Sequence, residues 1–89
     1  MYLSIKAKKD LEKLPRHIVR KLLSWVLDVE NRGLEAVRLI PGFHDEALRG
    51  TRKGQRSIRL NRSYRAIYEI QTDGTIEFVE ILEVNKHEY

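Results

Sequence analysis

The sequence predicts an α+β domain in which helices pack on one face of a small, curved and mostly antiparallel sheet. Apolar residues recur at helical spacing in the first part of the chain and alternate as in strands after residue 54, and turn-forming residues separate these segments. The predicted order of elements is β-α-α-β-β-β. Helices that precede a run of strands are typical of the α+β class.

The first predicted elements are a short edge strand and two helices. Residues 2–6 alternate between apolar and polar side chains, and residues 8–14 fit one or two helical turns. Pro15 suits the first turn of the next helix, because its missing N–H would have no partner there. Gly33 ends that helix. Its apolar stripe consists of Ile18, Leu22, Val26 and Val29.

Three consecutive strands are predicted after the turn at Pro41 and Gly42. They cover residues 55–60, 64–70 and 75–84. Residues 61–63 form a tight connection, and Asp73 followed by Gly74 is a common hairpin turn. We therefore expect an antiparallel meander whose inner face packs on the helices and whose outer face is open.

Length and composition limit the possible functions. A chain of 89 residues encloses one modest core, so we expect residues 1–89 to form a single domain. The sequence has neither an apolar run long enough to cross a membrane nor an export signal, so we expect a cytoplasmic protein without membrane contact. The absence of cysteine excludes disulfides and thiolate chemistry. We interpret His17 and His44 as surface residues, and we expect neither a metal nor a cofactor.

Positive charge is concentrated in residues 48–68. This stretch holds six of the ten arginines and one lysine, and no acid occurs between Glu46 and Glu69. The net charge is +4. An exposed face that serves only solubility usually mixes both signs of charge, so this pattern favours a polyanionic partner.

Strand alternation predicts where this charge lies. Side chains that point away from the predicted core should share one exposed face, and the preceding loop should add its cations to that face. The strand residues are Ser57, Arg59 and Arg65, and the loop residues are Arg49, Arg52 and Lys53.

Four residues near this face in sequence could cleave RNA: Glu46, Arg65, His87 and Tyr89. Cleavage through the ribose 2′-hydroxyl needs a base, a cation at the phosphate and an acid for the leaving 5′-oxygen. A carboxylate or an imidazole can act as the base, arginine can bind the phosphate, and imidazolium or phenol can act as the acid. The base remains open between Glu46 and His87. The terminal position of His87 and Tyr89 also fits a frayed end without a role.

The stretch from Pro41 to Tyr68 resembles the HigB and YoeB toxins of the RelE/ParE superfamily. The residues that carry the resemblance, in the same spacing, are Pro41-Gly42, Leu48-Arg49-Gly50, Arg52-Lys53-Gly54, Ser57-Ile58, Asn61 and Tyr64-Arg65. The resemblance implies helices packed on a curved antiparallel sheet. It also implies a metal-independent endonuclease that cleaves messenger RNA in the ribosomal A site, and a cognate antitoxin as partner besides the ribosome and the messenger RNA.

The resemblance also implies residue roles. Glu46 would act as or assist the general base, and Arg65 would hold the scissile phosphate with support from Arg59. His87 and Tyr89 resemble the His-Tyr pair at the end of YoeB-like toxins and would serve proton transfer and orientation, although Glu88 separates them here. Because Ser57 stands where RelE has a lysine, another residue would supply that cation. The remaining candidates for contact with RNA are Arg49, Arg52, Lys53, Arg56 and Lys86.

Two other functions fit the same sequence. A toxin of the ParE type would inhibit DNA gyrase on the same fold, since a fold does not determine an activity. A noncatalytic module would bind RNA or the ribosome through the basic face without cutting.

Overall fold

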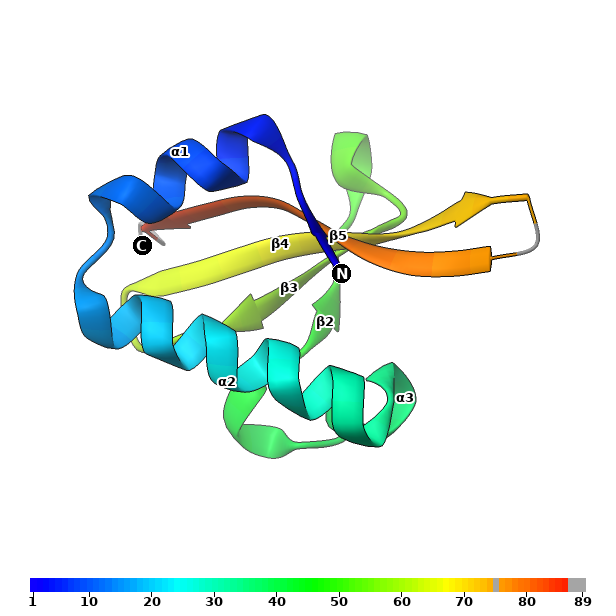
Figure 1. Cartoon of the computed structure of the whole chain (residues 1–89), viewed down its shortest axis with the longest axis horizontal. Helices are drawn as coiled ribbons and strands as arrows, with labels where there is room; N and C mark the ends of the chain where they lie inside the picture. The colour runs from blue at the N-terminus through cyan, green and yellow to red at the C-terminus, as the bar shows by residue number, and fades with distance from the viewer. Residues whose placement is uncertain (75, 87–89) are drawn as a thin grey trace.

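The computed structural model describes residues 1–74 and 76–86 and has the α+β fold that the sequence predicts (Figure 1). No helix in these ranges is long and apolar enough to cross a membrane. The elements are β1 (Tyr2–Leu3), α1 (Ile5–Lys13), α2 (Arg16–Arg32), α3 (Leu34–Val37), η1 (Pro41–Phe43), β2 (Glu46–Ala47), η2 (Gly50–Arg52), β3 (Gln55–Arg59), β4 (Tyr64–Asp73) and β5 (Ile76–Lys86).

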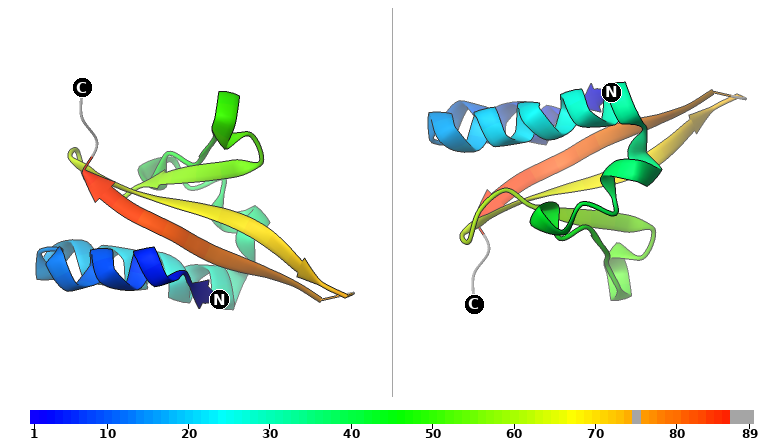
Figure 2. Two further views of the ribbon diagram at one scale, coloured as in Figure 1. Left: turned by 90° about the horizontal axis from the view of Figure 1, so that it is seen from above. Right: turned by 90° about the horizontal axis from the view of Figure 1, so that it is seen from below.

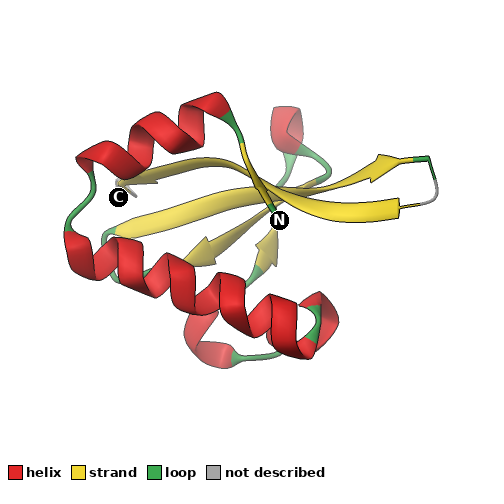
Figure 3. Ribbon diagram, viewed as in Figure 1, coloured by secondary structure: helices red, strands yellow, loops and turns green. Residues whose placement is uncertain are grey.

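The five strands form one sheet in the order β1-β5-β4-β3-β2. β1 runs parallel to β5, and the other neighbours are antiparallel. The helices α1 and α2 lie on one side of the sheet and η2 projects from the other side (Figure 2). Figure 3 distinguishes the helices from the strands in the view of Figure 1. We call the side of the sheet opposite α1 and α2 the outer face.

The amino-terminal strand is shorter than predicted. β1 ends at Leu3 because Ser4 begins the helix α1: the Ser4 hydroxyl oxygen accepts a hydrogen bond from the Ala7 amide at 2.9 Å. The same hydroxyl donates to the Leu82 carbonyl on β5. The cap therefore fixes the start of α1 against the sheet, which alternation over residues 2–6 did not indicate.

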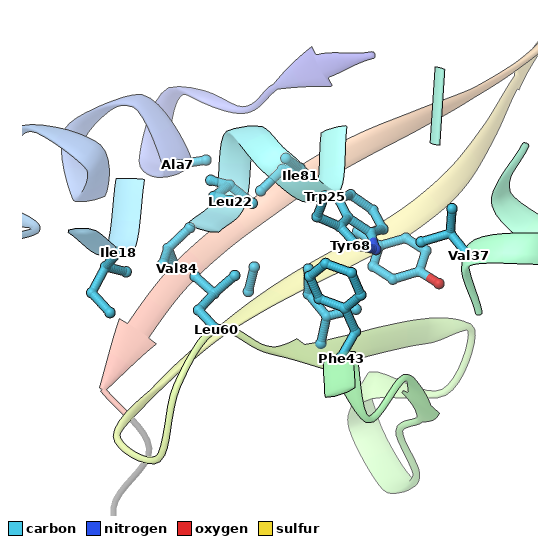
Figure 4. Close-up of a cluster of buried hydrophobic side chains, with 12 residues drawn as sticks. Ala7, Ile18, Leu22, Trp25, Val37, Phe43, Leu60, Tyr68, Ile81 and Val84 are labelled. Carbon is cyan, nitrogen blue, oxygen red and sulfur yellow. The ribbon is translucent and has the colours of Figure 1, made fainter. Parts of the chain in front are cut away.

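The core lies between α2 and the inner face of the sheet (Figure 4). Ile18, Leu22 and Trp25 on α2 are buried, as the helical stripe predicts for the first two. The Trp25 and Tyr68 rings lie 5.0 Å apart between centroids. This contact joins the middle of α2 to the middle of β4.

The outer face is less open than we predicted. Ser57, which we expected to be exposed, is 4% exposed, and its neighbour Ile67 on β4 is 0% exposed. Arg52 crosses this part of the sheet, because its guanidinium donates to Gln55 on β3 at 2.9 Å and to Glu83 on β5 at 3.0 Å. One side chain thus bridges β3 and β5 across β4, and holds the loop between β2 and β3 over the sheet.

Candidate functional site

A surface pocket lies on the outer face, where the β2–β3–β4 part of the sheet meets the segment after η1. Its side chains come from four parts of the chain that the fold brings together. The lining residues that we consider further are His44, Glu46, Arg59, Arg62 and Arg65. The pocket thus combines a carboxylate and an imidazole with three guanidinium groups.

The segment that carries Glu46 is fixed by a buried neighbour. The Asp45 side chain is 1% exposed, and it accepts hydrogen bonds from Arg56 Nε at 2.6 Å and from the Tyr68 hydroxyl. These two bonds fix the segment against the core. His44 and Glu46 both line the pocket.

The buried cluster shifts the pKa values of its donors. Burial, followed by the hydrogen bond and the charge of Asp45, raises the pKa of the Tyr68 phenol above its usual value. Burial lowers the pKa of Arg56, but the hydrogen bond and the charge of Asp45 outweigh this effect and leave its pKa raised. Tyr68 is therefore neutral and Arg56 charged at neutral pH, so both donate to Asp45.

His44 contributes a functional group that the sequence did not single out. Its Nε2 lies 3.8 Å from a carboxylate oxygen of Glu46, and both side chains are about half exposed. We interpreted His44 as a surface residue, which agrees with its exposure but misses its partner. Sequence patterns gave no signal for this pairing, because His44 has left-handed dihedrals (φ 47°, ψ 51°) and strand alternation does not apply across it.

Two arginines stand directly opposite each other beside this pair. Arg59 on β3 is the register partner of Arg65 on β4. Like charges in such positions repel and cost stability, so the pairing favours an anion that would relieve the repulsion. Arg65 is also linked to β5, since its Nε donates to the Asn85 side-chain oxygen at 3.4 Å.

The structure places the other predicted RNA contacts in different surroundings. Arg49 and Lys53 are exposed on the loop around η2, whereas Arg52 is engaged with Glu83. Arg56 lies on the side of the sheet opposite Arg59 and is bonded to Asp45, so it does not join the basic face. Lys86 ends β5 as the register partner of Tyr64 and not of Arg65. His87 and Tyr89 lie outside the described residues.

Acidic residues of β5 divide the outer face. Glu80 is the register partner of Glu69, and Glu83 is the register partner of Ile67. Asn85 donates to Glu83 at 2.7 Å and accepts from Arg65, which connects the acidic part to the arginine pair. The face that we expected to be uniformly basic therefore has a basic end at the pocket and an acidic centre. The sequence did not indicate this, because Glu80 and Glu83 lie on β5, outside the basic stretch of residues 48–68.

The pocket has the groups that proton transfer next to a phosphate requires. A carboxylate and an imidazole can exchange protons with a bound hydroxyl, and guanidinium groups bind phosphate oxygens with two parallel hydrogen bonds. Among the described residues, no three side chains from His, Asp and Glu gather as a metal site.

Comparisons with known proteins agree with this fold. The family model described as the ParE toxin of type II toxin–antitoxin systems, parDE, matches residues 2–87. No curated protein matches the sequence.

Several solved structures share the fold at low identity. The YoeB/ParE toxin from Agrobacterium tumefaciens is 19% identical, with a TM-score of 0.72 over 99% of this chain and 100% of that chain. YafQ from Escherichia coli is 20% identical, with a TM-score of 0.74 over 96% of this chain and 89% of that chain. The YoeB–YefM complex from Staphylococcus aureus contains a chain that is 19% identical, with a TM-score of 0.71 over 98% of this chain and 94% of that one.

The family match covers nearly the whole chain, and the structural matches cover the same elements that build the pocket. The chain therefore belongs to the RelE/ParE superfamily, as a toxin of a type II toxin–antitoxin system.

Proposed function

We propose that this toxin is an endonuclease that cleaves messenger RNA in the A site of the ribosome. The observation that carries the proposal is the pocket in which Glu46 and Arg65 lie together with Arg59. A carboxylate beside two opposed arginines combines proton transfer with phosphate binding. The sequence resemblance to HigB and YoeB toxins points to the same activity.

In the proposed reaction, the Glu46 carboxylate removes the proton of the ribose 2′-hydroxyl. Arg65 binds the scissile phosphate and stabilises the charge of the transition state, and Arg59 supports it from the adjacent strand. The products are a 2′,3′-cyclic phosphate and a 5′-hydroxyl. The resemblance implies that His87 and Tyr89 contribute to proton transfer and orientation, and it does not assign the residue that protonates the 5′-oxygen.

The dependence on the ribosome follows from the openness of the site. Arg59 and Glu46 are exposed on the outer face, so the toxin provides few walls to orient a flexible RNA chain. Correct orientation of the reacting groups supplies a large part of enzymatic rate enhancement. We propose that the ribosome supplies it by holding the message in the A site.

We also propose that a cognate antitoxin neutralises the toxin by covering the basic end of the outer face. The complexes DinJ–YafQ and YoeB–YefM contain relatives of this chain with their antitoxins. Charge complementarity favours an acidic segment as the covering element. Purified antitoxin that leaves cleavage unaffected would contradict this mode of neutralisation.

The test is primer extension on a message that is translated in a reconstituted system. Purified toxin should produce cuts in the A-site codon only when ribosomes are present. Glu46→Gln and Arg65→Ala should each lower the cutting rate by about 100-fold or more, since each removes a group that acts in the transition state.

Matched controls are available on the opposite side of the molecule. Glu12 on α1 and Arg20 on α2 are exposed, so Glu12→Gln and Arg20→Ala remove the same charges away from the pocket. These variants should cut like the wild type. Wild-type toxin that gives no cuts on translating ribosomes would contradict the proposed activity.

Inhibition of DNA gyrase is the second candidate, because the matching family model is that of the ParE toxins. A supercoiling assay with purified gyrase distinguishes the two activities. Inhibition that survives Glu46→Gln and Arg65→Ala, together with absence of RNA cutting, would favour the gyrase function.

A further inference from the structure

We propose that His44 is a second catalytic residue of this pocket and acts as the general acid, while Glu46 acts as the base. The inference rests on the proposed function and assigns a role to a residue that the resemblance to known toxins does not include. It concerns the proton that the leaving 5′-oxygen must receive.

The first support is the geometry of the pair. His44 Nε2 lies 3.8 Å from Glu46 Oε2, at a distance where a protonated imidazole and an ionised carboxylate attract each other. Their side chains are 55% and 57% exposed. A substrate can therefore reach both groups at once, and solvent screening makes the attraction a weak source of stability.

The second support is the backbone of His44. Its φ of 47° and ψ of 51° lie in the left-handed region, and it is the one residue other than glycine with positive φ in the described ranges. A side chain there costs conformational energy, and such outliers cluster at functional sites. Glycine would avoid that cost, whereas histidine at this position places a proton-transfer group at the pocket.

The third support is the way the conformation is held. The His44 amide donates to the Pro41 carbonyl at 3.1 Å and closes the η1 turn. On the other side, Asp45 is anchored by Arg56 and Tyr68. The backbone on both sides of the residue is thus fixed by bonds outside the pocket, and His44 Nε2 lies 3.8 Å from Glu46.

The proposed reaction uses Glu46 as a carboxylate and His44 as an imidazolium. Glu46, as the carboxylate, accepts the proton of the ribose 2′-hydroxyl while the 2′-oxygen forms a bond to phosphorus. The bond between phosphorus and the 5′-oxygen breaks, and the 5′-oxygen takes a proton from the His44 imidazolium. The site is then left with neutral Glu46 and neutral His44. Transfer of one proton between them restores the ion pair without net gain or loss.

Arg65 completes the arrangement. Arg65 lines the same pocket, where Arg59 is its register partner and Asn85 accepts a hydrogen bond from its Nε. It would bind the nonbridging phosphate oxygens, while Glu46 and His44 serve the two bridging oxygens. The base, the acid and the cation that binds the phosphate then all come from the described part of the chain.

The first experiment measures cutting by His44→Gln on translating ribosomes, with His17→Gln as the control. His17 is an exposed histidine on α2, on the other side of the sheet. We expect His44→Gln to cut about 100-fold more slowly or worse, and His17→Gln to cut like the wild type.

The second experiment identifies the role as that of an acid. A message with sulfur in place of the scissile 5′-oxygen has a leaving group that departs without protonation. His44→Gln should cut this message nearly as fast as the wild type does, whereas Glu46→Gln should stay slow. Equal losses for His44→Gln on both messages would overturn the assignment of the acid.

A further variant separates catalysis from folding. His44→Gly removes the imidazole and suits the positive φ, so its thermal unfolding should occur at or above the wild-type temperature. Its cutting should nevertheless be lost, and added imidazole should restore part of it. A His44→Gly toxin that is stable and cuts normally would overturn the proposal.

The outcomes also distinguish this inference from the function on which it rests. Wild-type toxin that cuts while His44→Gln cuts equally well would overturn the role of His44 and leave the endonuclease intact. Wild-type toxin that gives no cuts on ribosomes would overturn the endonuclease and, with it, the role of His44.

Discussion

The Tyr68 hydroxyl on the inner face of the sheet donates a hydrogen bond to the buried carboxylate of Asp45. This bond joins the core to the segment that carries His44 and Glu46. The Tyr68 ring also packs against Trp25 on α2, with 5.0 Å between the ring centroids. Tyr68 and Asp45 therefore connect the pocket segment to the packing of α2.

Replacing Asp45 should destabilise the fold strongly. Asp45→Ala leaves Arg56 and the Tyr68 hydroxyl without their acceptor, and loss of one partner of a buried ion pair costs about 3 to 5 kcal/mol in free energy of unfolding. Urea unfolding followed by circular dichroism measures this change. Glu12→Ala removes an exposed acid on α1 and should change stability by less than about 0.5 kcal/mol. Equal effects of both variants would show that Asp45 is not an anchor.

Tyr68 should make the stability sensitive to alkaline pH. Its pKa in the folded state is raised above the ordinary value of 10.0, so the unfolded chain loses the phenol proton first as the pH rises. Folding then binds a proton, and the free energy of unfolding contributed by Tyr68 is present below pH 10.0 and falls above it. The free energy of unfolding, measured with urea from neutral pH to above pH 10.0, should decline less for Tyr68→Phe than for the wild type. Parallel declines would contradict the shift.

Asn85 should position Arg65 for phosphate binding. Its side chain accepts from Arg65 and donates to Glu83, so Asn85→Ala releases the guanidinium on that side. Misplacement of a catalytic group by about 1 Å can cost up to about 100-fold in rate, and we expect a loss of about tenfold in cutting. The effect should vanish in an Arg65→Ala background. Additive losses in the double variant would mean that Asn85 acts through another residue.

Arg59 should lower the stability of the folded toxin and strengthen its binding to the ribosome. Its charge opposes that of Arg65 across the two strands, so Arg59→Gln should leave the free energy of unfolding unchanged or raise it by about 0.5 kcal/mol. The same variant should bind ribosomes more weakly and with a smaller dependence on salt, because it loses one phosphate contact. Sedimentation with ribosomes at several salt concentrations measures this. Arg20→Ala on α2 provides a control with the same loss of charge.

Local patterns predicted the elements well. The stripe from Ile18 to Val29 and the residues Pro15 and Gly33 located α2 at Arg16–Arg32, and the turn at Gly74 located the hairpin of β4 and β5. These features depend on neighbours within a few residues, since helix and strand periodicity are local properties of the chain. Glu46, Arg59 and Arg65 were also found this way, and the structure brings them into one pocket.

Local patterns did not predict the features that depend on partners distant in the chain. Ser4 ends β1 because it bonds to Leu82 as well as to Ala7. Ser57 is buried beneath a loop that Arg52 ties to Glu83, 31 residues away. Arg56 lies on the inner side of β3 with Ile58, as strand alternation requires, and the distant feature is the buried Asp45 that accepts its hydrogen bond.

The amino-acid sequence thus determines the order of elements, the family and the sign of the charge at the pocket. Periodicity, turn residues and motif spacing are local features that can be recognised in the sequence alone. The pairing of His44 with Glu46, the buried Asp45 beneath them and the acidic centre of the outer face were decided by the tertiary structure. The acidic centre arises because β4 and β5 are neighbours in the sheet, and Asp45 is buried because Arg56 on β3 and Tyr68 on β4 both reach it. Burial and ion pairing are set by which segments meet in space and not by how far apart they are in the chain.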